Sequence, residues 1–259
     1  MVASTFFDLY TRQGLLPHRK LPFVLGMECT GTITALGVED TDLKVGQKVI
    51  CYDYNGGLYR EKLRVKPENC YLLPDFVDLK IGASLFVNYV TAYVSLFEIG
   101  NLRKNENVLI MSCAGGVGCA ATQLAKTIEG VQIFGTGSKQ KEEEAKGNGV
   151  DVFYAYDTFQ SEAAKNKFDI IVTNQTGPIL TFLQGILNPL GRIVITGAAN
   201  LVPNETKISV FSLLKVWWSM KNISIESLIM NNRIVAGLHM GTLIECDREK
   251  VKTALNYIF

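Results

Sequence analysis

The chain has 259 residues, of which 47% are hydrophobic and 20% are charged. This composition is ordinary for a chain that buries a core. It excludes a disordered protein, because disorder requires low hydrophobicity and high net charge. The formal net charge is +1, so the chain lacks the positive surplus of nucleic-acid-binding proteins, and we expect no nucleic-acid partner.

The cysteines indicate a reduced, metal-free protein. There are 6 cysteines and 2 histidines. No Cys-x-x-Cys pair occurs, whereas a structural zinc site needs four close ligands that usually come in such pairs. Dense disulfide frameworks belong to much shorter secreted chains, and Met1–Asp8 lacks the basic and apolar regions of a signal peptide. We therefore expect reduced thiols, no metal site and a cytoplasmic location. The cysteines are Cys29, Cys51, Cys70, Cys113, Cys119 and Cys246.

The N-terminal part of the chain, residues 1–88, is predicted to form short strands and turns. Runs rich in β-forming residues occur at 32–36 and 48–52. Glycines punctuate them at intervals that mark turns and bulges.

A stretch without charged residues runs from 81 to 97 and approaches the roughly 17–25 residues of a membrane-spanning helix. Its polar side chains recur at steps of four, three and four residues, so in a single helix they form one polar stripe. Such a stripe suits a buried helix that faces a polar cleft better than a helix in lipid. The stripe consists of Ser84, Asn88, Thr91 and Ser95.

From about residue 104, strand-like apolar runs alternate with helical patterns. This alternation is typical of a parallel α/β sheet, and we assign residues 89–259 to it. The predicted strands are 107–112, 131–135, 169–173, 192–196 and 233–238, and helices are predicted at 118–128 and 179–187.

The strongest chemical signal is a glycine-rich turn between a predicted strand and a predicted helix. The apolar run 108–112 leads into Gly115, Gly116, Val117 and Gly118. Glycines let the backbone approach a pyrophosphate, and the start of the following helix adds a partial positive charge. A glycine triplet alone also fits a simple turn, but the strand–turn–helix setting favours a dinucleotide-binding site.

The end of the second predicted strand favours NADP(H) over NAD(H). An NAD site usually places Asp or Glu there, to hold the ribose 2′-hydroxyl. Here the strand runs into 135–141 without a carboxylate. Ser138 offers a hydrogen bond and Lys139 a positive charge to a 2′-phosphate. In the alternative interpretation the lysines simply begin a solvated helix, in which Glu142 and Lys146 pair across one turn.

Several segments together carry a resemblance to a known family. The chain resembles the zinc-independent quinone oxidoreductases of the medium-chain dehydrogenase/reductase superfamily, and within them it is most similar to the synaptic vesicle membrane protein VAT-1 homologues. The matching segments are 8–14, 26–28, 46–49, 87–93, 100–102 and 114–118, with the more specific 197–201, 217–218, 232–233 and 237–241.

The resemblance implies a doubly wound Rossmann sheet preceded by a partial GroES-like β-rich domain. It also implies hydride transfer from NADPH to a quinone or an enone, that is, to an activated C=C. Zinc-dependent relatives have a Gly-His-Glu motif whose histidine binds zinc, and here Met27 stands in its place. The resemblance therefore implies chemistry that depends on positioning and on a hydrogen bond to a developing oxyanion, without a metal.

The resemblance also assigns roles to individual residues. The turn 115–118 would hold the pyrophosphate, and Ser138 with Lys139 would hold the 2′-phosphate. Tyr156 would face the cofactor phosphates, although it also fits simple surface packing. Asn88 and Thr91 would lie near the nicotinamide and are candidates for the substrate cleft, although satisfied helix side chains would give the same pattern.

Four positions depart from the family pattern. Thr5 stands where an asparagine is usual and Leu16 where a tyrosine is common, while 173–174 replaces an aspartate and Ser112 replaces a smaller residue. These departures keep a second hypothesis open, a VAT-1-like nucleotide-binding scaffold with little catalysis. Such a scaffold would lie peripherally on a vesicle or mitochondrial outer membrane. An enoyl-thioester reductase is a third, weaker interpretation.

The stretch 208–220 contains Trp217 and Trp218 and is amphipathic. It suits either a lipid- or partner-facing surface or packing within the protein or a homodimer.

Compared with the family, the chain is short at both ends. The sequence therefore predicts a fragment or partial gene product, in which opening strands of the first domain and a C-terminal return to that domain are missing.

Overall fold

The computed structural model describes residues 1–14, 21–38, 41–197 and 223–259. The chain divides into two compact units, one formed by Met1–Val90 with Ile244–Phe259 and the other by Thr91–Leu243. The sequence placed the boundary at residue 88 and assigned everything beyond it to the nucleotide-binding domain. In the structure, Ile244–Phe259 group with the first unit, so a return to that unit lies within the chain.

The first unit contains a three-stranded antiparallel sheet in the order β1-β2-β3. One face of the sheet packs against Leu58. On the other face, the rings of Tyr52 and Tyr71 both contact Phe86. The elements are α1 (Phe6–Arg12), β1 (Glu28–Thr32), β2 (Lys48–Tyr52), η1 (Pro67–Asn69), β3 (Cys70–Leu72), α2 (Leu79–Gly82), the start of α3 (Phe86–Tyr93), the end of α10 (Met240–Cys246) and α11 (Arg248–Ile258).

The strand predicted at 48–52 is confirmed as β2, but the strand predicted at 32–36 is wrong. The strand in this region, β1, ends at Thr32. Only Ile33 continues the pairing, since its N–H donates to the carbonyl of Gln47. The β-forming residues beyond it have no neighbouring strand to pair with among the residues that the structure describes.

The C-terminal helix α11 joins the first unit through both apolar and polar contacts. Its buried residues are Val251, Ala254 and Leu255, which recur at helical spacing on one face. At its start, Arg248 donates to the carbonyl of Glu68 and to the side chain of Asn69.

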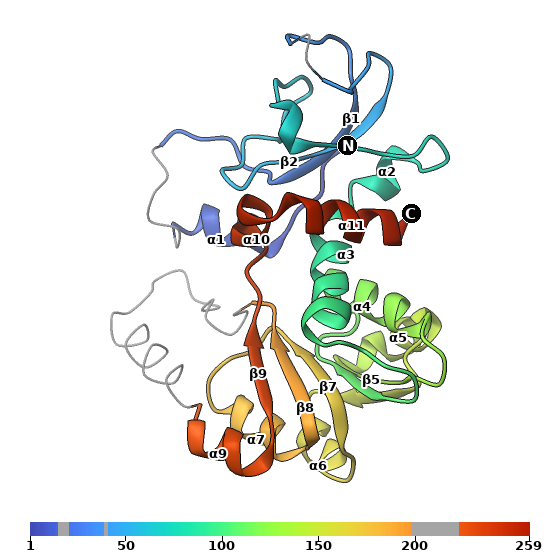
Figure 1. Cartoon of the computed structure of the whole chain (residues 1–259), viewed down its shortest axis with the longest axis vertical. Helices are drawn as coiled ribbons and strands as arrows, with labels where there is room; N and C mark the ends of the chain where they lie inside the picture. Colours follow the sequence, from blue (N-terminus) through green and yellow to red (C-terminus); the bar gives the residue numbers. More distant parts are fainter. Residues whose placement is uncertain (15–20, 39–40, 198–222) are drawn as a thin grey trace. The chain divides into compact units, whose positions relative to one another are not determined.

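The second unit is built on a six-stranded sheet in the order β6-β5-β4-β7-β8-β9, in which every neighbouring pair is parallel. Figure 1 shows β9, β8 and β7 side by side. The strands are β4 (Asn107–Ile110), β5 (Gln132–Gly137), β6 (Val152–Ala155), β7 (Phe168–Thr173), β8 (Leu187–Ile195) and β9 (Ile234–Gly237). The predicted parallel α/β sheet is thus confirmed, although β6, a short edge strand, was not among the predicted strands.

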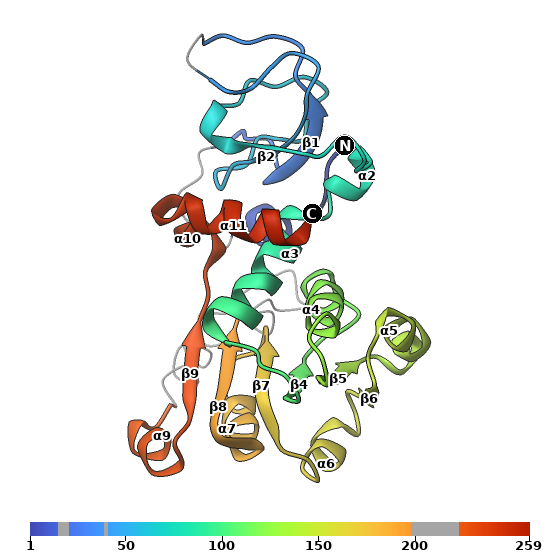
Figure 2. The same ribbon diagram turned by 45° about the vertical axis from the view of Figure 1, so that its right-hand side comes forward.

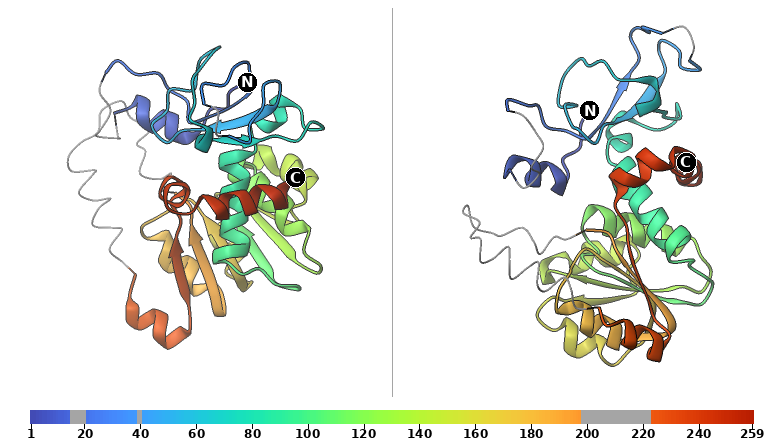
Figure 3. Two further views of the ribbon diagram at one scale, coloured as in Figure 1. Left: turned by 45° about the horizontal axis from the view of Figure 1, so that its top comes forward. Right: turned by 60° about the vertical axis from the view of Figure 1, so that its left-hand side comes forward.

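This strand order defines a doubly wound Rossmann sheet. The chain starts in the middle at β4, builds outward to β6, and returns to the middle to build outward again from β7. The switch point between β4 and β7 is where such sheets bind ligands, at the carboxyl ends of the strands. The sheet twists strongly, as Figure 3 shows.

Helices cover the sheet and close its core. In Figure 2, α4 (Gly116–Lys126) lies next to β4 and β5, and α5 (Glu142–Asn148) lies beside α4, next to β6. Phe134, Phe168 and Leu183 are among the buried residues of the main core cluster. The remaining helices of this unit are η2 (Val94–Ile99), η3 (Lys139–Lys141), α6 (Phe159–Ala163), α7 (Ile179–Gly185) and α9 (Ile225–Asn231), with the end of α3 and the start of α10.

The polar stripe was drawn on the assumption that the uncharged stretch 81–97 is a single helix, and the structure shows that it is not. It forms α2, a turn at 83–85, and then α3, which continues into the π-helical segment η2. Its polar side chains bond back to the helix backbone, for example from Ser95 Oγ to the Thr91 carbonyl at 2.6 Å. Among the helices in the described ranges, none has the length and apolarity needed to cross a bilayer.

Candidate nucleotide-binding site

The candidate site lies at the carboxyl edge of the six-stranded sheet. Because the strands are parallel, the residues that follow them meet at one edge. Ser112 follows β4, Ser138 follows β5, Tyr156 follows β6 and Asn174 follows β7. Every cofactor-binding residue predicted from the sequence lies in this second unit.

The glycine turn presents free donors at the start of α4. Gly115 is the N-cap residue, and the helix begins at Gly116. Both glycines are exposed. In the first helical turn the backbone N–H groups of residues 116–118 have no partner within the helix. With the positive end of the helix dipole, these N–H groups form a site for an anion such as a pyrophosphate.

Gly118 lets α4 pack closely on the turn that precedes it. A Cβ atom at this position would lie 2.3 Å from the carbonyl oxygen of Ser112 and 2.7 Å from Cα of Cys113. Both neighbours are backbone atoms and cannot rotate away. Only glycine fits without moving the helix.

We expect Gly118→Ala to lower the free energy of unfolding by about 1–3 kcal/mol, because the helix must shift to admit the added methyl group. Nucleotide affinity should fall as well, since the shift moves the first-turn N–H groups. Urea unfolding and fluorescence titration measure the two effects. The control is Gly147→Ala in α5, where a Cβ meets nothing within 4 Å. It should stabilise the protein by roughly 0.5–1 kcal/mol. Equal effects for the two variants would contradict the close packing at Gly118.

Ser112 and Tyr156 meet across the glycine turn. The hydroxyl of Tyr156 donates to Ser112 Oγ at 3.0 Å, and the Tyr156 N–H donates to the carbonyl of Gly137. Ser112 has a φ of 55°, and its N–H donates to Thr136 Oγ1. The half-exposed Tyr156 ring is therefore fixed against the turn. From the sequence, Ser112 was identified only as a departure from the family pattern, and its contact with Tyr156 was not predicted.

The lysines after β5 have different surroundings. Lys141 pairs with Glu144 at 2.5 Å, and Lys146 pairs with Glu142 at 2.6 Å. The predicted pairing of Glu142 with Lys146 is thus confirmed. Lys139 is exposed and forms no ion pair with any residue in the described ranges. Its charge is available at the end of β5, directly after Ser138.

At the switch point the structure leaves an acceptor without a donor. Asn174 Oδ1 is buried and has no hydrogen-bond partner among the residues that the structure describes. The neighbouring Thr173 is buried, and its hydroxyl accepts from the N–H of Gln175. An unpaired buried oxygen is costly, so a hydroxyl or amide of a bound nucleotide is a suitable partner.

The two residues predicted for the substrate cleft lie on one helix. Asn88 is half-buried in the first unit, and its amide donates to the carbonyl of Ser84 at 3.2 Å. Thr91 is buried and belongs to the second unit. Their proposed contact with substrate stays a prediction.

The departure at Thr5 has a structural explanation. The N–H and hydroxyl of Thr5 both donate to Asp8 Oδ2, at 2.9 and 3.1 Å. Asp8 also accepts from Tyr59 and from the N–H of Gly26. Thr5 therefore helps to fix a buried carboxylate in the first unit. Leu16, Trp217 and Trp218 lie outside the described residues.

Met27 is buried in the first unit. Across the described residues, no group of three or more His, Cys, Asp or Glu side chains is arranged to hold a metal ion.

Comparison with known proteins identifies the family. The alcohol dehydrogenase GroES-like domain matches residues 1–75, and the zinc-binding dehydrogenase family matches residues 116–257. The chain belongs to this dehydrogenase family, which is part of the medium-chain dehydrogenase/reductase superfamily. The family membership and the fold inferred from the sequence resemblance are thereby confirmed.

The chain is also similar to particular members. It is 37% identical over 264 residues to the synaptic vesicle membrane protein VAT-1 homolog of Danio rerio, covering 100% of this chain and 54% of that protein. The chain thus spans about half the length of this relative.

Solved structures agree with this. The human synaptic vesicle membrane protein VAT-1 homolog-like protein is 27% identical, with a TM-score of 0.78 over 99% of this chain and 72% of that one. The quinone oxidoreductase of Thermus thermophilus, solved with NADPH, is 25% identical, with a TM-score of 0.76 over 99% of this chain and 75% of that one.

Proposed function

We propose that the chain is an NADPH-dependent oxidoreductase of the quinone or enone type. The observation that carries this proposal is the carboxyl edge of the sheet, where the exposed glycine turn, Ser138 and the exposed Lys139 follow neighbouring strands. The likeness to a quinone oxidoreductase solved with NADPH supports it.

The residues present fit the cofactor. The first-turn N–H groups of α4 suit its pyrophosphate, Lys139 suits its 2′-phosphate, and Asn174 Oδ1, unpaired among the described residues, can accept from one of its hydroxyl or amide groups. NADPH, when bound, supplies the hydride. The protein's part is to hold the cofactor in place and to exclude the competing NADH, which lacks the 2′-phosphate. Asn88 and Thr91 are the proposed substrate-side residues.

Replacing Lys139 with glutamate tests cofactor choice. We expect Lys139→Glu to weaken NADPH binding about 10- to 100-fold, because a charge-assisted hydrogen bond to the phosphate is lost and repulsion is added. NADH affinity should change little. Titration of protein and cofactor fluorescence measures both. Lys141→Glu is the matched control, since it makes the same change of charge two residues away. Equal losses for NADPH and NADH would show that Lys139 does not contact the 2′-phosphate.

The catalytic step needs its own measurement. NADPH oxidation should be followed with a panel of quinones and enones, using the protein whose NADPH affinity has been measured. Turnover supports the proposal, and NADPH binding without turnover contradicts it. Failure to bind either nucleotide would contradict both this function and the alternative below.

The alternative is a nucleotide-binding scaffold associated with a membrane surface. It is favoured by the names of the relatives, which are synaptic vesicle membrane proteins, and by Thr5, whose hydroxyl is engaged by Asp8. Co-sedimentation with vesicles of neutral and of anionic lipid, with and without NADPH, separates it from the enzyme. Vesicle binding together with absent turnover is the result that it requires.

A further inference from the structure

We propose that Cys51 and Cys70 are a redox modification site, at which a hydroperoxide converts the two thiols into a disulfide. Cys70 is the thiol that reacts with the oxidant, and Cys51 is the thiol that closes the bond. The proposal is independent of the nucleotide site, because both cysteines lie in the first unit.

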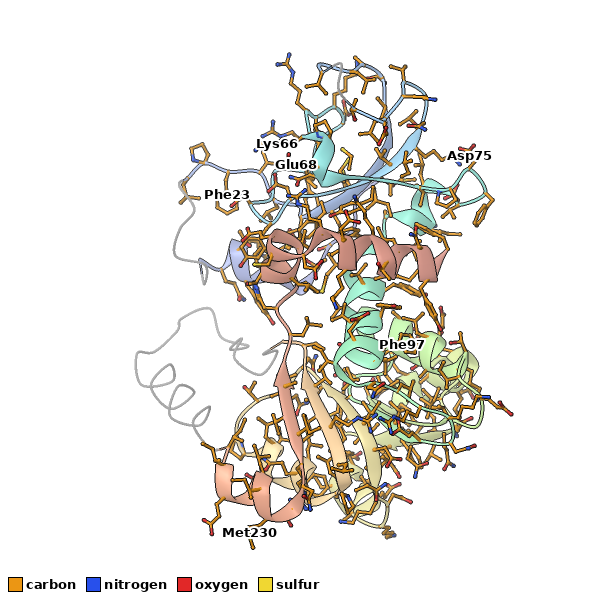
Figure 4. The ribbon with its side chains drawn as sticks, in the orientation of Figure 1. Phe23, Lys66, Glu68, Asp75, Phe97 and Met230 are labelled. Atoms are coloured by element: carbon orange, nitrogen blue, oxygen red, sulfur yellow. The ribbon has the colours of Figure 1, made fainter. Side chains whose placement is uncertain are left out.

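Three cysteines form a row across the antiparallel sheet. The register pairs Cys29 of β1 with Cys51 of β2, and Cys51 with Cys70 of β3. Directly opposed residues of a sheet point to the same face. The sulfur atoms of Cys51 and Cys70 lie 3.8 Å apart. Figure 4 labels Lys66 and Glu68 in the segment that leads into β3.

The hydrogen-bond pattern distinguishes the two neighbouring cysteine pairs. Between β2 and β3, the Leu73 N–H donates to the Lys48 carbonyl. Opposed pairs alternate between hydrogen-bonded and non-hydrogen-bonded positions. Lys48 and Leu73 are therefore a hydrogen-bonded pair. Cys51 and Cys70 are the third pair after them in the register, so by this alternation they are a non-hydrogen-bonded pair. Their Cα atoms are then about 4.5 Å apart with the side chains close, which lies within the span of a disulfide.

The same count separates Cys29 from the reactive pair. Between β1 and β2, the Asp53 N–H donates to the Met27 carbonyl. Two places further along, Cys29 and Cys51 are therefore a hydrogen-bonded pair, whose Cα atoms are about 5.5 Å apart and whose side chains approach less closely. Cys29 is a natural control, since it neighbours Cys51 but lies in the less favourable geometry.

Access favours Cys70 as the first thiol to react. Cys70 is partly exposed, whereas Cys51 and Cys29 are buried. Hydrogen bonds with Cys51 lower the pKa of both Cys70 and Cys29. Hydrogen bonds to both neighbours, with burial, raise the pKa of Cys51 far above its ordinary value. The thiolate is the nucleophile, and of the two thiols with a lowered pKa only Cys70 is partly exposed, so oxidation begins at Cys70.

The chemistry balances with a hydroperoxide as the only co-reactant. Cys70 ionises to a thiolate, which attacks one peroxide oxygen; the O–O bond breaks, and the leaving oxygen takes up the proton that Cys70 released. Cys70 is then a sulfenic acid. Cys51 attacks its sulfur, the S–O bond breaks as the S–S bond forms, and the proton of Cys51 leaves with the hydroxyl as water. Two thiols are oxidised, and one peroxide is reduced.

The test is peptide mapping of the full chain after treatment with hydrogen peroxide and blocking of the remaining thiols. A linked peptide pair containing Cys51 and Cys70, lighter by two hydrogen atoms, is expected in the parent and in Cys29→Ser. It should be lost in Cys51→Ser and in Cys70→Ser. In Cys51→Ser, Cys70 should accumulate as a sulfenic acid that dimedone labels, whereas Cys51 in Cys70→Ser should stay unlabelled.

Two outcomes would overturn the proposal. One is a Cys29–Cys51 disulfide in place of the expected pair. The other is the absence of any internal disulfide in the parent, with oxidation confined to the exposed Cys246. Buried Cys113, whose pKa burial raises to about 11, serves as an unreactive thiol in the same map. The parent measurement needs no variant, so misfolding of a mutant cannot decide the result.

Discussion

Arg192→Ala should lower the free energy of unfolding by about 3–5 kcal/mol, because it leaves Glu106 as an unpaired, largely buried charge. Arg192 and Glu106 are only 11% and 16% exposed. The guanidinium donates to both carboxylate oxygens, at 2.7 and 3.0 Å. It also donates to the carbonyls of Gly100, Asn101 and Asp169, so one side chain joins β8 to the segment that precedes β4.

Urea unfolding of the variant and two controls measures this effect. Lys104→Ala breaks an exposed pair with Glu129 and should cost at most about 1 kcal/mol. Replacing Arg192 with Met and Glu106 with Leu together should recover part of the loss, because no charge is then left unpaired. Recovery should be incomplete, since three carbonyls still lose their donor. A loss for Arg192→Ala as small as that for Lys104→Ala would contradict the predicted role.

Glu28→Gln should remove a pH dependence of stability worth about 3 kcal/mol. Glu28 is fully buried in β1. Its Oε2 accepts from the N–H of Val87, while Oε1 has no partner among the described residues. Burial raises the pKa of Glu28 to about 7. The hydrogen bond from Val87 lowers this pKa, whereas the negative charge of Asp8 raises it further.

The sign follows from proton binding. With a folded pKa of about 7 and an ordinary value of 4.5, the folded protein binds more protons than the unfolded chain between these pH values. The contribution of Glu28 is fully present below about pH 4.5 and is lost as pH rises through about 7. Each pKa unit is worth about 1.4 kcal/mol, which gives the figure of about 3 kcal/mol.

Unfolding free energies at several pH values between about 5 and 8 test this prediction. The parent should lose stability across that range, and Glu28→Gln should lose much less. Exposed Glu61 provides the control, since Glu61→Gln should change stability by less than about 0.5 kcal/mol and leave the pH dependence intact. Parallel curves for the parent and Glu28→Gln would show that Glu28 is not the titrating group.

The sequence predicted correctly those structures whose pattern lies within one continuous segment of the chain. The strands near 107–110 and 169–173 are apolar on both faces, as buried parallel strands must be, and the glycine turn lies between a strand and a helix. These patterns sufficed to predict the sheet and the turn. The Glu142–Lys146 pair was predictable for the same reason, since both residues lie on one helical turn.

Contacts that depend on register or on distant partners could not be predicted in this way. Tyr156 and Ser112 are 44 residues apart, and nothing in either segment indicates the other. The cysteine row requires the alignment of three strands, and the first of these was expected too late in the chain. The amphipathic pattern of α11 predicts a buried face, but it does not say which surface covers that face.

The route of the chain through its two units also sets an order of events during synthesis. The second unit is one uninterrupted stretch, Thr91–Leu243, whereas the first is split between Met1–Val90 and Ile244–Phe259. On a ribosome, every residue of the second unit is made before α11 exists. The contact between Arg248 and Glu68 closes a separation of 180 residues. The first unit therefore cannot gain the contacts of α11 until the second unit has been made, and the apolar surface that α11 covers stays open while the second unit folds.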